Sequence, residues 1–323
     1  MKKVRIWGVI CVIIVLLVII CIYFNKENVS KLKVKDGVLK NSFGRTVQLR
    51  GVSSHGIQWD LEDNIVNYDN LKLLKEDWNI NVFRIAMYTE ENGYLYNKET
   101  IKNKVIDIID NCIELKLYVI VDWHILSDNN PNIHKQEAIE FFDEISKKYS
   151  KNNNLIYEIC NEPNGDNVRW ESSVYPYAKD VIETIRKNSP DSLVIVGTPD
   201  WCKSVMEVIG SQLPYKNVMY AFHFYSGTHG EVYRKSLEYA IEKGVPVFVS
   251  EWGTSVADNG DQVFEKEADE WLEFLNNRNI SWVNWSLSNK DEATSILKKG
   301  TKEVKDENLT QSGLYVKKKI QKK

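Results

Sequence analysis

The sequence lacks the patterns that cysteine chemistry requires. It has 5 cysteines in 323 residues and no CxxC spacing, and Cys11 and Cys21 lie in an apolar N-terminal stretch. The other three, Cys112, Cys160 and Cys202, are an odd number without metal-ligand spacing. A disulfide framework or a zinc cluster is therefore not predicted, and we expect these three to be small buried residues.

An excess of positive charge is also missing. The chain carries 42 basic and 45 acidic residues, for a formal net charge of −3. Nucleic-acid binding needs a basic field, so we predict no nucleic-acid partner. Neither a GxSxG elbow nor a glycine-rich phosphate loop is present, which argues against esterase and nucleotide chemistry. Aromatic residues are abundant, with 10 Trp and 16 Tyr; sugar rings stack on such faces, although Trp is also an ordinary core residue.

The first thirty residues differ from the rest. Three cations precede residues 6–24, which are 19 residues without a charge. As a helix they would span ~28 Å, close to the thickness of a bilayer core. A signal peptide would have a shorter apolar region and a small-x-small cleavage site, which is missing after Cys21. We therefore predict an uncleaved membrane anchor and short linker over residues 1–31. The domain after it would be extracellular, held by one pass through the cell membrane, and secreted if the segment is cleaved.

Residues 32–323 are predicted to form one domain, because no Pro-, Gly- or Ser-rich stretch divides them. One α/β barrel of about 250 residues or more absorbs this length. Alternation over residues 32–49, with turn signals at Asp36 and Phe43, predicts a short β-hairpin that closes one end of the barrel. Eight apolar runs of strand length are present, and eight strands close a barrel: 47–53, 82–87, 118–122, 155–160, 193–196, 218–222, 245–250 and 282–285.

Apolar residues recur at helical spacing between these runs. Strand ends recur about every 33 residues, near the length of a βα unit, so the predicted fold is a (β/α)8 TIM barrel. A last helix starting near Thr310 is predicted to expose residues 317–323. The helical faces predicted to be buried are Ile101, Val105, Ile108, Ile109, Cys112 and Ile113; Ala138, Phe141, Phe142 and Ile145; Val181, Ile182 and Ile185; and Ala268, Trp271, Leu272 and Leu275.

Two of the predicted strands end in one glutamate each. The run 155–160 is followed by Asn161 and Glu162, and the run 245–250 is followed by Glu251. Every strand of an α/β barrel points the same way, so the C-terminal strand ends form one ring around one mouth. We therefore expect the two carboxylates to face each other across a cleft. The alternative is that one or both of them simply pair with arginines.

Other strand ends add polar and aromatic residues to this ring. Each of its three histidines lies on a different strand, so metal-ligand spacing on a shared element is absent and no metal is predicted. Paired carboxylates with aromatic platforms fit glycosidic bond cleavage, in which one acid protonates the leaving oxygen and the other carboxylate attacks the sugar or activates water. The additional ring members are Ser54, His55, Arg84, Asp122, Trp123, His124, Trp201, His223, Phe224, Tyr225, Trp252 and Trp285; Trp123 and Trp252 are alternatively core residues.

Seven short motifs resemble those of one known family. The sequences NEP, SEWG, DWH, HFY and NWSL, which begin at residues 161, 250, 122, 223 and 284, are similar to motifs of family-5 glycoside hydrolases, the cellulase A family. Within it, RGVSSHGIQW at 50–59 and NKDE at 289–292 resemble the bacterial endo-β-1,4-glucanase subfamily. The similarity runs in the expected order from about residue 33 to 320.

The resemblance implies a role for each matching residue. Glu162 matches the general acid/base, and Glu251 matches the nucleophile of a retaining double displacement. Arg84 and Tyr225 match the groups that hydrogen-bond the nucleophile and keep it ionised. His223 matches the partner of the acid/base.

Further matches concern contacts to sugar. Asn161 and His124 match contacts to sugar hydroxyls at the cleavage subsite, and Trp285 matches the platform under that sugar. The residues that match the lining of the flanking subsites are His55, Trp59, Tyr88, Trp201, Lys290 and Glu292.

The implied activity is endo-cleavage of cellulose or soluble β-1,4-glucan by a monomer without a cofactor. Three alternatives remain: a relative acting on mannan, xyloglucan or mixed-linkage glucan; a membrane-anchored glucan-binding protein that does not cleave; and a metal-dependent hydrolase on the same barrel. We see no separate carbohydrate-binding module, so amorphous or soluble chains are expected rather than crystalline cellulose. Retention requires carboxyl groups ~5 to 5.5 Å apart and inversion ~6.5 to 9.5 Å, a distance that sequence does not measure.

Overall fold

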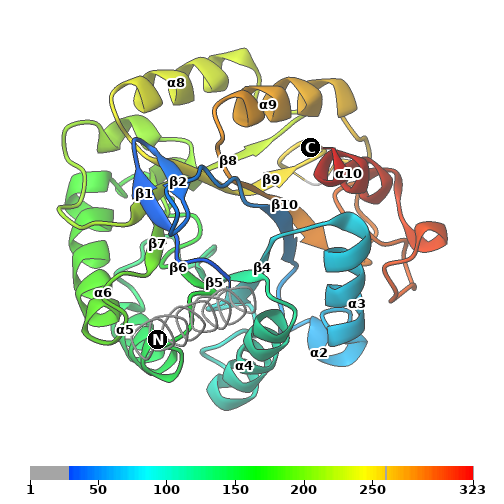
Figure 1. The fold of residues 1–323 in the computed structure, drawn as a ribbon, viewed down its shortest axis with the longest axis horizontal. Helices are drawn as coiled ribbons and strands as arrows, with labels where there is room; N and C mark the ends of the chain where they lie inside the picture. Colours follow the sequence, from blue (N-terminus) through cyan, green and yellow to red (C-terminus); the bar gives the residue numbers. More distant parts are fainter. Residues whose placement is uncertain (1–28, 259, 323) are drawn as a thin grey trace, which may run out of the picture.

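The computed structural model describes residues 29–258 and 260–322. Its centre is a closed parallel barrel with the strand order β10-β3-β4-β5-β6-β7-β8-β9 (Figure 1), which confirms the predicted TIM barrel. Each predicted strand overlaps an observed one, and their ends differ by at most three residues. The strands are β3 (Arg50–Ser54), β4 (Val82–Tyr88), β5 (Tyr118–His124), β6 (Leu155–Glu158), β7 (Leu193–Val196), β8 (Val218–Tyr225), β9 (Val247–Gly253) and β10 (Trp282–Leu287).

The barrel strands are buried on both faces. Successive side chains of a strand point to opposite faces, so a strand between barrel interior and helices is apolar almost throughout. In β4, Val82, Ala86 and Tyr88 belong to the inner clusters, whereas Phe83, Ile85 and Met87 belong to the core under the helices. Arg84 therefore points into the barrel, because it lies on the same face as Val82 and Ala86.

A ring of helices surrounds the barrel. Every predicted helical face is buried in the structure except Ile113, which is partly buried. The helices are α3 (Tyr68–Leu73), α4 (Lys98–Glu114), α5 (Lys135–Lys148), α6 (Tyr175–Asn188), α8 (Glu231–Glu242), α9 (Glu265–Asn277) and α10 (Gln311–Gln321), with short elements α2 (Asp60–Asp63), α7 (Pro199–Cys202), η1 (Leu74–Trp78), η2 (Trp170–Val174), η3 (Val205–Val208) and η4 (Asp306–Asn308).

The C-terminal helix α10 begins as predicted, with the Thr310 side chain accepting a hydrogen bond from the Gly313 backbone N–H. Its lysines are not all solvated, because Lys317 lies 2.5 Å from Asp77 and 2.6 Å from Asp306. The prediction that residues 317–323 are simply a solvated face is therefore wrong for Lys317, and also for Ile320, which is buried in the core.

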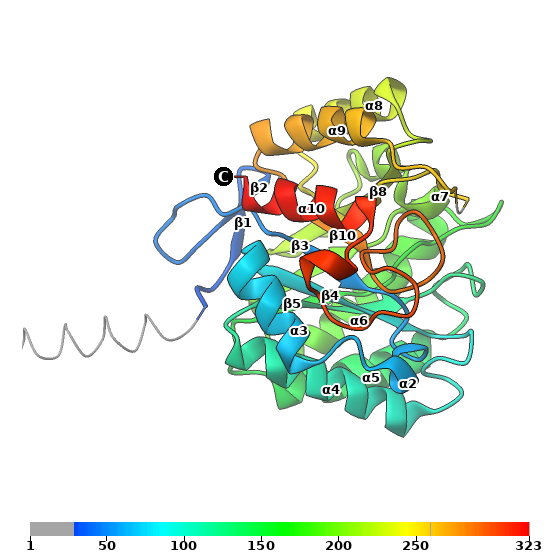
Figure 2. The same cartoon turned by 90° about the vertical axis from the view of Figure 1, so that its right-hand side faces the viewer.

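The N-terminal hairpin closes one end of the barrel, as predicted. It consists of β1 (Lys33–Lys35) and β2 (Val38–Lys40), and Leu32, Leu39 and Leu49 share one buried cluster with inward residues of the barrel strands. The Val47 N–H donates to the Leu39 carbonyl at 2.9 Å, so the chain at Val47 pairs with the hairpin. The first barrel strand, β3, begins later than predicted, at Arg50. In Figure 2 the hairpin and the end of α10 lie at one end of the barrel, and α7 lies at the other.

Two further predictions concern the three cysteines after residue 31 and the N-terminal membrane anchor. Cys112, Cys160 and Cys202 are buried and unpaired, as expected. The predicted anchor at 6–24 lies outside the described residues, and none of the helices in 29–258 and 260–322 has the length and apolar character needed to cross a bilayer.

Candidate active site

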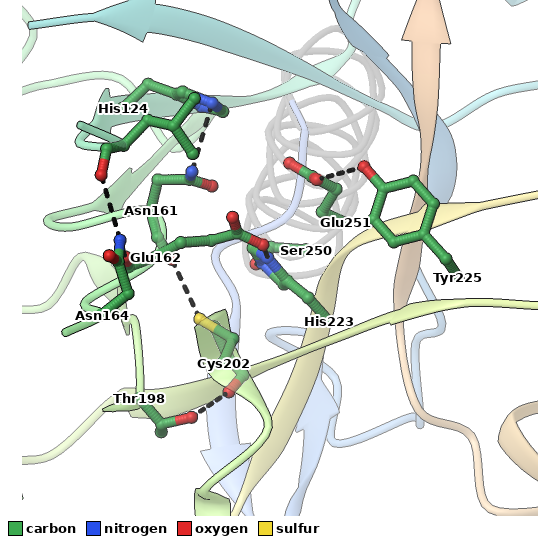
Figure 3. A network of polar contacts seen from close by, with 12 residues as sticks. His124, Asn161, Glu162, Asn164, Thr198, Cys202, His223, Tyr225, Ser250 and Glu251 are labelled. Atoms are coloured by element: carbon green, nitrogen blue, oxygen red, sulfur yellow. Dashed lines mark hydrogen bonds and ion pairs between the residues drawn. The ribbon is translucent and has the colours of Figure 1, made fainter. Parts of the chain in front are cut away.

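Two glutamates meet at the C-terminal end of the barrel. Glu162 follows β6 and Glu251 lies in β9, and parallel strands bring both to the same mouth. One oxygen from each carboxylate and one ring nitrogen of His223 all lie within 4.8 Å of one another. Figure 3 shows the two side chains directed toward each other. The two carboxylates therefore face a common space.

Glu251 receives a hydrogen bond on each carboxylate oxygen. The Arg84 guanidinium donates from Nη1 to Oε2 at 3.0 Å, and the Tyr225 hydroxyl donates to Oε1 at 2.9 Å. Burial and the charge of Glu251 raise the pKa of Tyr225, so its hydroxyl keeps the proton that it donates. Both oxygens of Glu251 are therefore held in place, one by a cation and one by a hydroxyl donor.

Arg84 also holds the acids beneath the site. It donates from Nε to Glu158 Oε2 at 2.7 Å, and its Nη2 lies 3.0 Å from Asp122 Oδ2. Burial alone lowers the pKa of Arg84, but Asp122, Glu158 and Glu251 outweigh this effect and raise it well above its usual value. Burial conversely favours protonation of Glu158, but Arg84 and His223 lower its pKa to about 2. Arg84 and Glu158 thus form a buried ion pair under the mouth, whereas burial raises the pKa of Asp122 well above its usual value.

In the part of the chain that the structure describes, Glu162 has one side-chain partner, the imidazole of His223. The distance from His223 Nδ1 to Glu162 Oε1 is 2.8 Å, and His223 Nε2 lies 3.0 Å from the Ser250 hydroxyl, which donates to Glu158 at 2.6 Å. Burial lowers the pKa of His223, but its contacts with Glu158 and Glu162 raise it to about 9. The protonated ring donates from both nitrogens, toward Glu162 and toward Ser250.

His124 and Asn161 form a second fixed group. His124 Nδ1 lies 2.6 Å from Asp122 Oδ2, and His124 Nε2 lies 3.2 Å from Asn161 Nδ2. Burial and the charge of Arg84 lower the pKa of His124 to about 3, so its ring is neutral. The contacts then assign the tautomer: Nδ1–H donates to Asp122, and Nε2 accepts from the Asn161 amide. Because Asn161 Oδ1 accepts from Arg84 at 2.7 Å, the amide orientation is set as well.

Aromatic side chains line a cavity of about 640 Å³ in front of these groups. The Trp285 and His124 rings are stacked with centroids 5.4 Å apart, and Tyr88 stacks on the same histidine at 4.1 Å. Trp59 and Trp201 are 47% and 44% exposed and offer open faces. Such faces suit sugar rings, whose C–H groups pack on aromatic surfaces.

The fourteen residues to which the family resemblance gave a role all lie at this mouth. Arg84 and Asn161 lie behind the cavity wall and contact it through Glu251 and His124. Trp123 and Trp252 are fully buried, which makes them core residues. The other twelve of the fourteen line the cavity: His55, Trp59, Tyr88, His124, Glu162, Trp201, His223, Tyr225, Glu251, Trp285, Lys290 and Glu292.

Several residues of the site were not predicted. Glu158 is a charged residue at an inward position of an apolar strand, and strand alternation is the signal that would have identified it. No local pattern marks the additional wall residues, which come from loops and a helix start: Glu91, Leu126, Lys203, Thr228, His229, Tyr233, Ala257 and Asp258.

Within residues 29–258 and 260–322, a metal ion would have to use the same three side chains. Glu162, His223 and Glu251 have the spacing of a cation site. However, His223 Nδ1 lies against Glu162 at 2.8 Å and the pKa of His223 is raised to about 9. A protonated imidazole has no lone pair for a metal, so this arrangement favours a proton-carrying network.

Comparisons with known proteins agree with this geometry. Residues 40–291 match the family model described as cellulase, glycosyl hydrolase family 5. Endoglucanase A of Evansella cellulosilytica is 51% identical over 280 residues, which is 86% of this chain and 57% of that protein. An endoglucanase of Clostridium saccharobutylicum is 46% identical over 294 residues, covering 90% of this chain and 65% of that protein. The chain thus spans less than two thirds of both relatives.

Among solved structures, the catalytic domain of a Thermobifida fusca endoglucanase in complex with cellotetraose is similar. It has a TM-score of 0.86 and 35% identity, over 90% of this chain and 97% of that one.

Proposed function

The chain belongs to the cellulase family, glycosyl hydrolase family 5, and on that premise we propose that it is an endo-acting, retaining β-1,4-glucanase. The observation that carries this proposal is the approach of Glu162 and Glu251 oxygens to within 4.8 Å. Inverting enzymes need ~6.5 to 9.5 Å between the carboxyl groups to admit a water molecule, whereas retaining enzymes have ~5 to 5.5 Å. The names of the relatives support glucan as the substrate.

In the first step Glu162 protonates the leaving oxygen while Glu251 attacks the anomeric carbon. Arg84 and Tyr225 hold the two oxygens of Glu251, so the attacking carboxylate is oriented before substrate arrives. The product is a covalent glycosyl-enzyme and a departing sugar hydroxyl.

In the second step Glu162 takes a proton from water, which attacks the same carbon and releases Glu251. Esterification has removed the charge of Glu251, so a carboxylate at Glu162 no longer faces a second anion. The protonated His223, 2.8 Å away, stabilises Glu162 after it has given up its proton. One pair of residues thus serves both steps.

The polymer, the oligomeric state and the location are parts of the same proposal. We infer cellulose or soluble β-1,4-glucan as substrate, a monomeric enzyme, and an extracellular domain anchored through residues 6–24. The entry of the chain at the hairpin, opposite α7 (Figure 2), supports this arrangement, because an anchor there would leave the mouth facing away from the membrane.

Product analysis tests the proposal. The full chain is incubated with carboxymethylcellulose, mannan and mixed-linkage glucan, and the first anomer is recorded by NMR. We expect fastest release from the β-1,4-glucans, with the β-anomer first. Release of the α-anomer would refute retention, and faster release from mannan would refute the glucan assignment. Glucan binding without sugar release would favour the non-catalytic alternative.

Chelation tests the metal-dependent alternative. Proton transfer between Glu162, His223 and the substrate needs no cation, so we expect EDTA to leave the rate of carboxymethylcellulose hydrolysis unchanged. Loss of activity on chelation and its recovery with one divalent metal would instead place a cation between Glu162, His223 and Glu251.

A further inference from the structure

The loop after β7 contains a turn of unusual handedness. Within α7, Asp200, Trp201 and Cys202 have φ values of 57°, 54° and 60°. These are left-handed values, which residues with a Cβ avoid because the side chain crowds the following carbonyl. Three in succession persist only where surrounding contacts hold them. We call this segment the 200–202 turn.

The 200–202 turn is bonded to the residues on both sides of Glu162. The Trp201 backbone N–H donates to the Pro163 carbonyl at 3.2 Å, and the Cys202 thiol donates to the Asn161 carbonyl at 2.9 Å (Figure 3). Burial raises the pKa of the Cys202 thiol, so it keeps the proton that it donates. Glu162 is therefore bracketed by two hydrogen bonds from one short turn.

Close backbone packing supports the same connection. A Cβ added at Gly197, just before the turn, would lie 2.1 Å from the Cys160 carbonyl oxygen and 2.7 Å from that of Asn161. Only glycine permits this approach. On the opposite side, Asn164 Nδ2 donates to the Glu162 carbonyl at 2.8 Å. Asn164 Nδ2 also donates to the carbonyl of Leu126, in the loop after β5, at 3.0 Å. The backbone of the acid is thus held between that loop and the 200–202 turn.

Glu251 depends on different elements. Its two donors, Arg84 and Tyr225, come from β4 and β8, and neither hydrogen bond involves the 200–202 turn. A disturbance of the turn is therefore expected to move Glu162 while leaving the nucleophile in place. The same turn also places Trp201 in the cavity wall, so a movement of the turn would displace both this part of the wall and Glu162.

We propose that the 200–202 turn positions Glu162 for proton transfer, with Cys202 acting as a positioning residue through the Asn161 carbonyl. The inference rests on the proposed function, because it assigns the turn to the acid/base step of that reaction. It predicts a defect confined to bonds whose leaving group needs a proton.

Two substrates separate this role from general damage. Cellotetraose has a poor leaving group and depends on the acid, whereas dinitrophenyl β-cellobioside has an activated leaving group that departs without one. The value of kcat/KM reports the step up to glycosyl-enzyme formation. It is measured for the full-length wild type, Cys202→Ala, Cys202→Ser and the control Cys112→Ala, which removes a buried thiol from α4.

For Cys202→Ala we expect kcat/KM for cellotetraose to fall ~10-fold, with less than about a 2-fold change for the dinitrophenyl substrate. Cys202→Ser keeps a donor on a shorter bond, and we expect a loss of ~3-fold on cellotetraose alone. The control is expected to leave the ratio between the substrates at its wild-type value.

If the ratio of kcat/KM values for the two substrates stays at the wild-type value in Cys202→Ala, the inference is overturned, whether both values are unchanged or both fall equally. If that variant does not fold, Cys202→Ser decides by the same criterion. A wild type that cleaves neither substrate would instead refute the proposed function.

Discussion

Glu162 and Glu251 are the same side chain at the same end of two parallel strands, yet their surroundings differ. Glu251 accepts one hydrogen bond on each oxygen, from Arg84 and Tyr225, and its side chain is 5% exposed. Among the described residues Glu162 has a single side-chain partner, His223, and its own side chain is 11% exposed. Their neighbours, and not the residue type, divide the two roles.

The difference also concerns how each carboxylate is held. Glu251 is fixed through its side chain by residues of β4 and β8, which suits a nucleophile that must be charged and immobile. Glu162 is fixed mainly through the backbone on either side of it, so its carboxyl oxygens remain available to exchange a proton with sugar and water. The following changes would break or sharpen this contrast.

Removing the nucleophile should have the largest effect. Glu251→Gln keeps the shape of the side chain but cannot form the glycosyl-enzyme, and we expect kcat on carboxymethylcellulose to fall ~10⁵-fold. Cellotetraose affinity, measured by calorimetry, should change little because the cleft is intact. Residual activity above about 1%, after exclusion of wild-type contamination, would argue against Glu251 as nucleophile.

Removing the acid should have a smaller and more selective effect. For Glu162→Gln we expect kcat/KM on cellotetraose to fall ~10³-fold, because general acid catalysis contributes 10²- to 10⁴-fold. The dinitrophenyl cellobioside should lose far less in kcat/KM. Equal losses on both substrates would contradict the assignment of Glu162 as the proton donor.

The partner of Glu162 should make stability pH-dependent. The folded-state pKa of His223 is about 9, above the unfolded value of 6.5, so its contribution is complete below pH 6.5 and is lost as the pH rises through 9. Between pH 6.5 and 9 we expect the wild type to lose on the order of 3 kcal/mol in free energy of unfolding, measured by urea denaturation. His223→Gln should not show this loss. Parallel curves for the two proteins would exclude this origin.

Removing one donor from Glu251 should have the smallest effect of the four. Tyr225→Phe deletes a hydrogen bond to a charged group, which contributes about 1.5 to 3 kcal/mol, so kcat should fall ~10- to 100-fold. Arg84 remains, so activity should not be abolished. A fall as large as that of Glu251→Gln would mean that Tyr225 has a second function.

The strands, and the polar residues that follow them, could be predicted from the sequence because the patterns that identify them lie within short stretches of the chain. Apolar runs of strand length followed by residues such as Asn161 and Glu162 identify barrel strands and their mouth ends. The polar residues His223 and Glu251 were placed after their strands, but they pair with each other inside the sheet. Local patterns mark a strand by its apolar residues, and they miss polar residues that the barrel interior accommodates.

The amino-acid sequence by itself determined the barrel, the hairpin that closes it and the identity of the two glutamates at its mouth, since periodicity and strand exits are properties of neighbouring residues. Only the tertiary structure decided the approach of their oxygens to within 4.8 Å, the charged network of Arg84 and Glu158, and the left-handed 200–202 turn. These features arise when segments far apart in the chain meet as the barrel closes. Their geometry is set by contacts that no local pattern contains.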